Sequence, residues 1–373
     1  MAKIEVVQAC TVSVPLDDPI VFATRRVTAR EYTLVHVRTD DGVVGLGVAY
    51  VSNEGGSLAT TAVRDLIAPK LVGKDPLLVE LHWDSLYQDL LLHGRAGSVM
   101  RALSAVDVAL WDRNARAVGL PLWKYLGGAA EESVPAYASG GYHLSGKGVE
   151  GVADEAQSYV DAGFTAVKIK VGGVGLKEDV ARVAAVREVI GEEGTLLLDA
   201  NHAWASLTGA LQAAEAFAPY GPLFLEEPFG PDDTRLHEAY SRSASVPLAT
   251  GELMSGRWSF QRLLAADAVR YIQPDASGCG GITEFRRIAA TAASFGVEVW
   301  PHWLHDIHVH LVASTPNSGM VEYFPDAHVL NFRWLIDHQL EVAAGRIRLP
   351  DRPGLGMDLV EERVEKYLVD PWG

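Results

Sequence analysis

From about Val134 onward, short apolar runs alternate with longer amphipathic stretches. In chain order the eight runs are VPAYASG, AVKIKVG, TLLLDAN, LFLEEPF, PLATGE, AVRYIQPD, VEVWPHW and GMVEYF. The segments between them, such as KEDVARVAAVREVI, have helical spacing. Alternating strands and helices indicate a parallel sheet. Eight strands over roughly 200 residues favour a closed (β/α) barrel, and an open sheet is the alternative.

The N-terminal part of the chain follows a different pattern. Residues 34–38 and 43–49 surround the turn sequence TDDG and predict a hairpin. Three stretches with helical spacing follow, at Gly56–Gly73, Asp75–Leu92 and Ser98–Val118. We therefore expect an α+β unit ahead of the barrel.

Two lysines, Lys168 and Lys170, interrupt an otherwise apolar predicted strand. Side chains two apart on a strand share a face, so the two ammonium groups point the same way. A like charge disfavours protonation, so we expect a lowered pKa for Lys170 and a role as a base. Lys168 would stay charged and hold a substrate oxygen. The alternative is that both lysines form salt bridges with nearby carboxylates.

Ionisable side chains lie at or near the ends of the later strands. They are Asp199, Glu226, Glu227, Glu252, Asp275, His302 and Glu322. A lone acid there is usually a helix cap or a solvated loop residue. Six successive strands with such residues argue against coincidence, and in a barrel they would converge on the mouth formed by the C-terminal strand ends. Only one of the adjacent Glu226 and Glu227 can face inward, and Glu227 is expected to pair elsewhere.

Three of these carboxylates, Asp199, Glu226 and Glu252, come from adjacent predicted strands. Without a counter-charge they would repel one another strongly. A divalent cation resolves the repulsion, and an all-oxygen ligand set favours Mg2+, with Mn2+ second. The sequence therefore predicts a metal site.

His302 is the second candidate base. Asp275, one strand earlier, would hydrogen-bond its imidazole and fix its tautomer. Lys170 and His302 would then flank a substrate from opposite sides and remove a proton next to a carboxylate, while the metal and Lys168 stabilise the enediolate. Glu322, if protonated, would donate a hydrogen bond to it. Three further histidines are expected to be packing or surface residues of a helix: His305, His308 and His310.

Composition narrows the class of protein. The 373 residues carry a formal net charge of −16, which argues against a nucleic-acid partner. No apolar run reaches the roughly 18 residues that a membrane helix needs. The N-terminus lacks the apolar region of a secretory signal, and two cysteines imply no disulfide framework. A soluble, cytoplasmic protein without a membrane partner is expected.

Together these motifs resemble the mandelate racemase branch of the enolase superfamily. The resemblance lies in VKIKVGG, LLLDAN, LEEP, TGE, IQPD, WPHW and GMVEYF, and in the helix ALSAVDVALWDRNARAVGLPLWKYLGG. It implies a modified (β/α)7β TIM-like barrel with an α+β capping domain built from the N-terminal region and the C-terminal tail. We expect a capping domain at 1–128, a barrel at 129–345, and a segment at 346–373 that returns to the capping domain.

The resemblance also implies roles for the site residues. Asp199, Glu226 and Glu252 would bind Mg2+. Lys170 would be the base on one face, with Lys168 as its electrostatic partner. His302 with Asp275 would be the acid/base on the other face, and Glu322 would donate a hydrogen bond to the enolate. Members often form homo-octamers or dimers, so a homo-oligomer is expected.

The function implied by this resemblance is a Mg2+-dependent acid-sugar dehydratase, a lyase that forms a 2-keto-3-deoxy acid. The alternative is a racemase or epimerase of a 2-hydroxy acid that uses the same lysine and histidine. Two other classes serve as checks: a Schiff-base aldolase with a lysine nucleophile, and a catalytically inactive binding protein.

Substrate specificity is expected to come from the capping loops VPLDDPIVFATRR and YVSNEGG and from residues at strand ends. An arginine in the first loop, Arg25 or Arg26, would bind a second carboxylate and favour an aldaric acid. The predicted substrate-binding residues are Asn201, Tyr142, His143, Arg25 and Tyr50.

Overall fold

The capping domain is built on an antiparallel sheet in the order β14-β1-β2-β3. The structure is a computed structural model that describes residues 2–128, 131–144 and 146–373. Strands β1 (Ile4–Val21), β2 (Arg26–Thr39) and β3 (Val44–Tyr50) follow one another in the chain, and β2 and β3 contain the predicted hairpin. The fourth strand, β14 (Leu368–Asp370), comes from the C-terminal region and pairs with β1.

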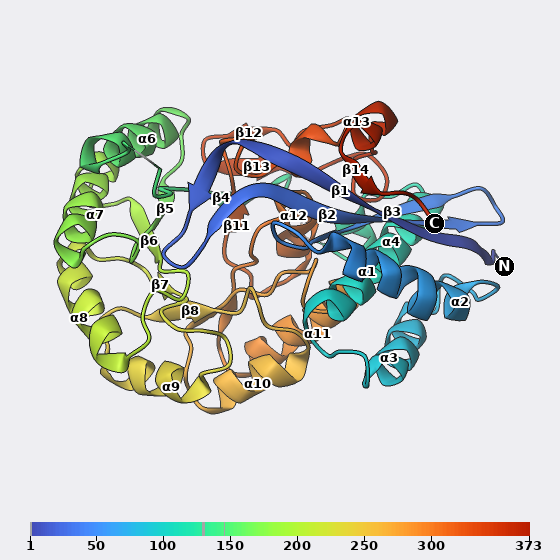
Figure 1. The fold of residues 1–373 in the computed structure, drawn as a ribbon, viewed down its shortest axis with the longest axis horizontal. Helices are drawn as coiled ribbons and strands as arrows, with labels where there is room; N and C mark the ends of the chain where they lie inside the picture. Colours follow the sequence, from blue (N-terminus) through green and yellow to red (C-terminus); the bar gives the residue numbers. More distant parts are fainter. Residues whose placement is uncertain (1, 129–130, 145) are drawn as a thin grey trace.

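Helices cover one face of this sheet (Figure 1). The long helix α4 (Gly97–Ala117) packs against β3 closely because Gly45 and Gly47 have no side chains. A Cβ atom at either glycine would overlap a backbone carbonyl oxygen of α4. The other helical segments are α1 (Gly56–Ala62), a π-helical turn at Val63–Ile67, α2 (Ala68–Leu71) and α3 (Val79–Leu90).

The three predicted helical stretches are therefore present, with two differences. The first is divided by the π-helical turn. The second starts at Val79 rather than at Asp75. Asp75 instead accepts a hydrogen bond from the backbone N–H of Leu77, which shapes the turn around Pro76.

Each of the eight predicted apolar runs contains a barrel strand. The strands are β4 (Ser133–Gly140), β5 (Ala166–Lys170), β6 (Thr195–Asp199), β7 (Leu225–Glu226), β8 (Leu248–Thr250), β9 (Tyr271–Ile272), β10 (Glu298–Val299) and β11 (Val321–Tyr323). Neighbouring strands from β4 to β10 are parallel. The barrel closes because β11 pairs with β4, while Gly319 donates a backbone hydrogen bond to Val299 at 2.9 Å. The closed barrel is thereby confirmed over the open sheet.

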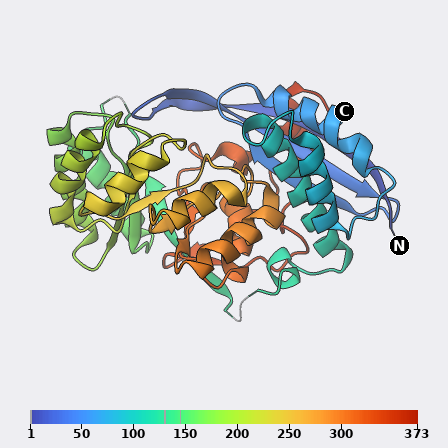
Figure 2. The same cartoon turned by 90° about the horizontal axis from the view of Figure 1, so that it is seen from below.

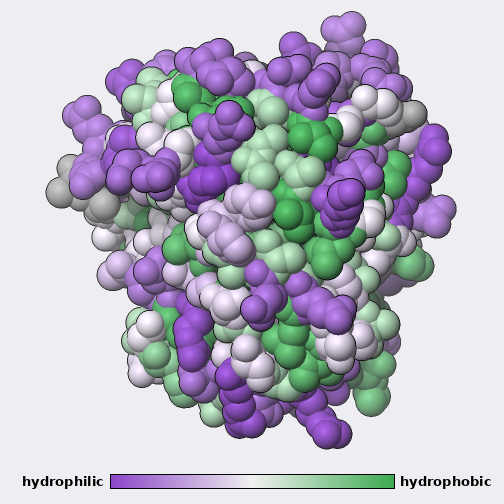
Figure 3. All heavy atoms as spheres, turned by 90° about the vertical axis from the view of Figure 1, so that its left-hand side faces the viewer, coloured by the Kyte–Doolittle hydropathy of each residue, from purple (hydrophilic) through white to green (hydrophobic). Residues whose placement is uncertain are grey.

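Seven helices alternate with these strands, which gives the predicted (β/α)7β order. They are α6 (Val149–Asp161), α7 (Leu176–Ile190), α8 (Leu207–Phe217), α9 (Thr234–Ser243), α10 (Arg257–Ala265), α11 (Gly281–Ser294) and α12 (His305–Ser314). Helices α6 to α10 form an arc outside the strands (Figure 1). The outer surface on that side mixes hydrophilic with apolar side chains (Figure 3). Among the helices of the described ranges, none has the length and apolarity needed to cross a membrane.

The C-terminal region contributes to both units. A short strand, β13 (Arg346–Arg348), pairs antiparallel with β4 of the barrel and with β12 (Val342–Ala343). Helix α13 (Glu361–Lys366) follows near the C-terminus, and β14 then completes the capping sheet. The short helix α5 (Leu122–Tyr125) lies at the end of the N-terminal capping region. The predicted domain boundaries stay a prediction.

The β1–β2 hairpin extends from the capping domain over the barrel (Figures 1 and 2). The stretch VPLDDPIVFATRR, expected to be a loop, is mostly strand, and only residues 22–25 form the turn. Leu16 and Ile20 are buried while Asp17 and Asp18 are exposed, and the pairing register shifts between Pro15 and Ile20. Because of this register shift the apolar residues do not alternate regularly, so the sequence pattern does not predict the strand.

Candidate active site

Three buried carboxylates meet at the C-terminal ends of neighbouring strands. Asp199 ends β6, Glu226 ends β7, and Glu252 lies two residues beyond β8. Parallel pairing places Asp199 directly opposite Glu226. One oxygen of each of the three residues lies within 4.8 Å of the others, and a buried oxygen of Glu252, Oε2, accepts no hydrogen bond from the residues that the structure describes. This all-oxygen set could hold a hard divalent cation such as Mg2+.

Both lysines of β5 point into the same cluster. Lys170 Nζ donates to Asp199 Oδ2, while Lys168 Nζ donates to Glu226 Oε2 at 2.7 Å. Lys168 Nζ also lies 2.7 Å from Glu322 Oε1. The lysines therefore form the salt bridges that the sequence left as the alternative, and all three carboxylate partners are buried.

The pKa of Lys170 is raised here, and the expected lowering is not found. Burial, the largest effect, and the repulsion from Lys168 lower the pKa of Lys170, but Asp199, Tyr142 and Glu226 together outweigh them. Lys168 also has a raised pKa, because Glu226 and Glu322 outweigh its burial, so it is charged as expected. The sequence shows that two lysines share a face but not which of their neighbours lies nearest.

His302 follows β10 in the chain, and its imidazole lies beside Glu252 and Asp275. Its Nδ1 lies 3.3 Å from Asp275 Oδ2, and its Nε2 lies 3.3 Å from Glu252 Oε2. Burial lowers the pKa of His302, but Glu252 and the hydrogen bond with Asp275 together raise it to about 9. Asp275 also accepts a hydrogen bond from the backbone N–H of Ser277 at 2.8 Å, which fixes the carboxylate that orients the imidazole.

Glu322 of β11 differs from its expected form. Its Oε2 accepts a hydrogen bond from the backbone N–H of Trp303 at 2.8 Å. Burial raises the pKa of Glu322, but Lys168 and His302 outweigh it and lower the pKa to about 2. Glu322 is thus a carboxylate that accepts hydrogen bonds, whereas the sequence expectation made it a protonated donor.

Glu227 faces away from the three carboxylates, as expected from its place beside Glu226. Its Oε2 lies 2.9 Å from His202 Nε2. Both residues have a positive φ, 43° for Glu227 and 63° for His202. This strained segment directs Glu226 and Glu227 to opposite sides.

The three histidines of α12 are buried packing residues, and the possibility that they lie on the surface is wrong. His308 Nε2 accepts a hydrogen bond from the backbone N–H of Ala276 at 3.0 Å. Burial lowers the pKa of His308 and of His310 to about 4. His305 is equally buried and packs on Tyr323.

Two of the predicted substrate-binding residues lie beside the charged cluster. The Tyr142 ring centroid is 5.2 Å from Lys170 Nζ, and the side chain is buried. Asn201 is also buried, and its backbone N–H donates to Asp199 Oδ1 at 3.0 Å. The backbone oxygen of Asn201 accepts a hydrogen bond from Thr24 in the hairpin turn, which ties the hairpin to the barrel mouth.

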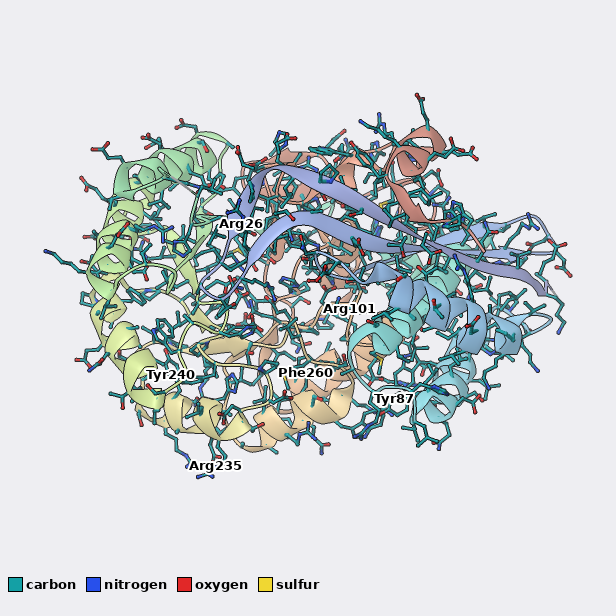
Figure 4. All side chains as sticks on the ribbon, viewed as in Figure 1. Arg26, Tyr87, Arg101, Arg235, Tyr240 and Phe260 are labelled. Atoms are coloured by element: carbon teal, nitrogen blue, oxygen red, sulfur yellow. The ribbon has the colours of Figure 1, made fainter. Side chains whose placement is uncertain are left out.

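The other three lie further out. His143 is held by Arg182, whose Nη1 lies 3.1 Å from its Nδ1. Arg25 is exposed and stacks over the Phe22 ring at 5.0 Å. Tyr50 accepts a hydrogen bond from Arg30 at its hydroxyl, while its backbone oxygen accepts one from Arg101. Figure 4 shows Arg26 on the hairpin and Arg101 between the capping helices and the barrel.

Two residues that border the site were not predicted. Arg30 is buried on β2, where alternation with Tyr32 and Leu34 places it on the inner face, so the signal was present in the sequence. Gln273, in the IQPD segment, donates to Glu226 Oε2 at 2.7 Å. A polar side chain two residues before Asp275 was the feature of the sequence that could have identified Gln273 as a site residue.

Comparison with known proteins gives a match over both units. The N-terminal domain described as mandelate racemase / muconate lactonizing enzyme matches residues 3–127. The domain described as enolase C-terminal domain-like matches residues 151–363. The two matches together span most of the chain.

Individual relatives are similar over nearly their full length. A 3,6-anhydro-alpha-L-galactonate cycloisomerase of Streptomyces coelicolor is 36% identical, with 91% of this chain and 92% of that protein covered. An arabinonate dehydratase of Saccharolobus solfataricus is 31% identical, with 90% of each chain covered. The crystal structure of an L-talarate dehydratase from Polaromonas sp. JS666, complexed with Mg and L-glucarate, is 32% identical with a TM-score of 0.91, covering 100% of this chain and 99% of that one.

Proposed function

Since the chain belongs to the mandelate racemase / muconate lactonizing enzyme family, we propose that it is a Mg2+-dependent acid-sugar dehydratase. It removes the proton α to a carboxylate and eliminates the β-hydroxyl to give a 2-keto-3-deoxy acid. The observation that supports this most is the placement of three buried carboxylates between the lysine pair of β5 and the His302–Asp275 pair. A relative named as an arabinonate dehydratase, and a second dehydratase crystallised with Mg and L-glucarate, support the same proposal.

The residues divide the reaction between them. Lys170 or His302, in its neutral form, takes the α-proton, and the electron pair of the broken C–H bond moves toward the carboxylate. The carboxylates that raise their pKa values here, Asp199 and Glu252, are the ones that would bind Mg2+, so a bound cation would oppose that rise. Lys168 holds a substrate oxygen on which negative charge develops. When bound by Asp199, Glu226 and Glu252, Mg2+ would neutralise that charge as a Lewis acid.

Elimination follows when the electron pair forms the C2=C3 bond and the C3–O bond breaks. His302, as an imidazolium, protonates the departing hydroxyl so that it leaves as water. Asp275 holds the imidazole at Nδ1 and leaves Nε2 to transfer the proton. The resulting enol tautomerises to the 2-keto acid.

A cycloisomerase is the second candidate, because one relative with 36% identity is named as one. If the leaving oxygen belongs to a ring, the same proton removal and elimination open the ring without loss of water. Racemisation or epimerisation of a 2-hydroxy acid is the third outcome, in which the proton returns and nothing leaves.

The test is a screen of mono- and diacid sugars with Mg2+, with semicarbazide to detect 2-keto products and D2O to detect α-proton exchange. Lys170→Ala and His302→Asn are compared with Lys177→Ala, an exposed lysine at the start of α7. We expect a keto product that disappears with EDTA, loss of it in both site variants, and no change in the control.

Other outcomes identify the alternatives. Keto product from a lactone or anhydro acid alone indicates a cycloisomerase, and exchange without keto product indicates a racemase or epimerase. Turnover that is indifferent to EDTA, with a lysine trapped by borohydride, would replace the proposal with a Schiff-base aldolase.

A further inference from the structure

Arg30 is a buried cation that has no carboxylate partner within the described part of the chain. Its residue is 1% exposed. Nε donates to the backbone oxygen of Val329 at 2.6 Å, and Nη1 donates to the Tyr50 hydroxyl at 3.0 Å. Nη2 is buried and donates to no atom of the described ranges 2–128, 131–144 and 146–373.

The other two buried arginines of the described chain differ in this respect. Arg113 forms a salt bridge with Asp41, and Arg182 forms one with Asp179 at 3.2 Å. A buried charge is costly unless it is paired, so each of these arginines has its counter-ion within the protein. Arg30 alone of the three lacks one among the residues that the structure describes.

Aromatic rings compensate the charge of Arg30 in part. Its guanidinium carbon lies 4.3 Å from the Trp303 ring centroid and 5.5 Å from that of Tyr50. These rings hold the guanidinium in place but accept no hydrogen bond from Nη2. The free donor on a fixed, planar group suits the oxygen of a carboxylate ligand.

The position of Arg30 relates it to both candidate bases. The Trp303 ring that stacks on Arg30 also stacks on His302, with ring centroids 5.9 Å apart. The Tyr142 ring centroid lies 5.2 Å from Lys170 Nζ, and burial raises the pKa of Tyr142 to about 12 although Lys170 and Arg30 both lower it. Arg30 is thus one aromatic side chain away from the place where a proton would be removed.

We propose that Arg30 binds the distal carboxylate of the substrate, so that the substrate is a diacid (an aldarate) rather than a monoacid. This inference rests on the proposed function, because it assigns the proximal carboxylate to the site between Lys170 and His302. It replaces the expectation for Arg25 and Arg26, since both of those side chains are exposed. Tyr50 becomes a positioning residue that orients the guanidinium.

The experiment compares a diacid with the monoacid that differs from it at one end only, such as galactarate and galactonate. If neither is turned over, another diacid and monoacid of matching stereochemistry take their place. The variants are Arg30→Met, Arg30→Lys and the control Arg38→Met, an exposed arginine further along the same strand. We expect Arg30→Met to lose about 100-fold in kcat/KM on the diacid, mainly through KM, and less than about 3-fold on the monoacid. Arg30→Lys should restore part of the loss, and Arg38→Met should change neither.

Activity on the monoacid shows that Arg30→Met is folded. If it does not fold, Arg30→Lys and Tyr50→Phe replace it, and both should weaken the diacid more than the monoacid. A wild-type preference for the monoacid, or an equal loss on both acids, overturns the inference and leaves the dehydratase standing.

Failure of the proposed function has a different signature. No acid would then be turned over or would exchange its α-proton. In that case calorimetric titration of galactarate into the Mg2+-loaded protein decides the inference. Binding that Arg30→Met abolishes would support the carboxylate site, and binding that is absent or unchanged would overturn it.

Discussion

His310 should make the stability of this protein depend on pH in a way that one substitution removes. Its Nδ1 accepts a hydrogen bond from the backbone N–H of Trp123 at 3.2 Å, and its Nε2 donates to the backbone oxygen of Leu355 at 3.1 Å. Both nitrogens are used by a neutral imidazole, and the side chain is fully buried. Burial therefore lowers the pKa of His310 to about 4, from an ordinary value of 6.5.

The sign of the effect follows from the lowered pKa. Below pH 6.5 the unfolded chain takes up a proton at this histidine, whereas the folded protein does not until about pH 4. The stabilisation is present above pH 6.5 and is lost as the pH falls to about 4. The full loss is about 3 kcal/mol, of which about 2 kcal/mol falls between pH 7 and pH 5.

The assay is urea unfolding at several pH values for the wild type and His310→Gln. Glutamine does not titrate, so the wild-type advantage should shrink by about 2 kcal/mol from pH 7 to pH 5. Every other titrating group is common to both proteins and cancels in the difference. His93→Gln, at an exposed histidine, should keep the wild-type pH dependence. A difference between wild type and His310→Gln that stays constant over this range would refute the reasoning.

Three further predictions concern the metal site, the histidine pair and the capping sheet. Glu252→Gln should weaken Mg2+ binding by at least about 100-fold in calorimetric titration, because loss of a group that only hydrogen-bonds to a metal ligand already costs about 10–100-fold in affinity. Unchanged affinity would exclude Glu252 as a ligand. Asp275→Asn should reduce kcat by about 100-fold or more with little change in KM, since it misorients His302, and a loss confined to KM would contradict that role. Trp372→Ala should lower the free energy of unfolding by about 1 kcal/mol, because its ring stacks on His36 at 4.5 Å; equal stability in urea would show that the stack contributes nothing.

The barrel could be predicted from the sequence because each of its strands is a short apolar run, and all but the first of them have an ionisable residue at or near the end. The chain order of Asp199, Glu226 and Glu252 was enough to place them at one mouth, since parallel strands all end on the same side. Local pattern and topology together determine these positions.

What the sequence did not reveal depends on distances between segments. The pKa of Lys170 depends on its contact with Asp199 on the neighbouring strand, and the spacing of the two lysines does not predict that contact. The length of the β1–β2 hairpin was hidden because Asp17 and Asp18 interrupt its alternation. The alternation of β2 places Arg30 on the inner face, but the sequence does not show that it lacks a carboxylate partner among the described residues.

The pairing of β14 with β1 has a consequence for how the protein is made. Thr11 pairs with Asp370, roughly 360 residues later in the chain, and Arg64 holds Asp370 at 2.9 Å. A ribosome adding about 5–20 residues per second needs roughly 20 to 70 s to cover that interval. During this time β1 and β2 have already left the ribosome. The edge of β1 that will pair with β14 is then unpaired and can associate with another chain. The nascent chain is therefore most vulnerable to aggregation at its capping sheet, and a chaperone that shields this edge should raise the yield of folded protein more than one that acts on the barrel.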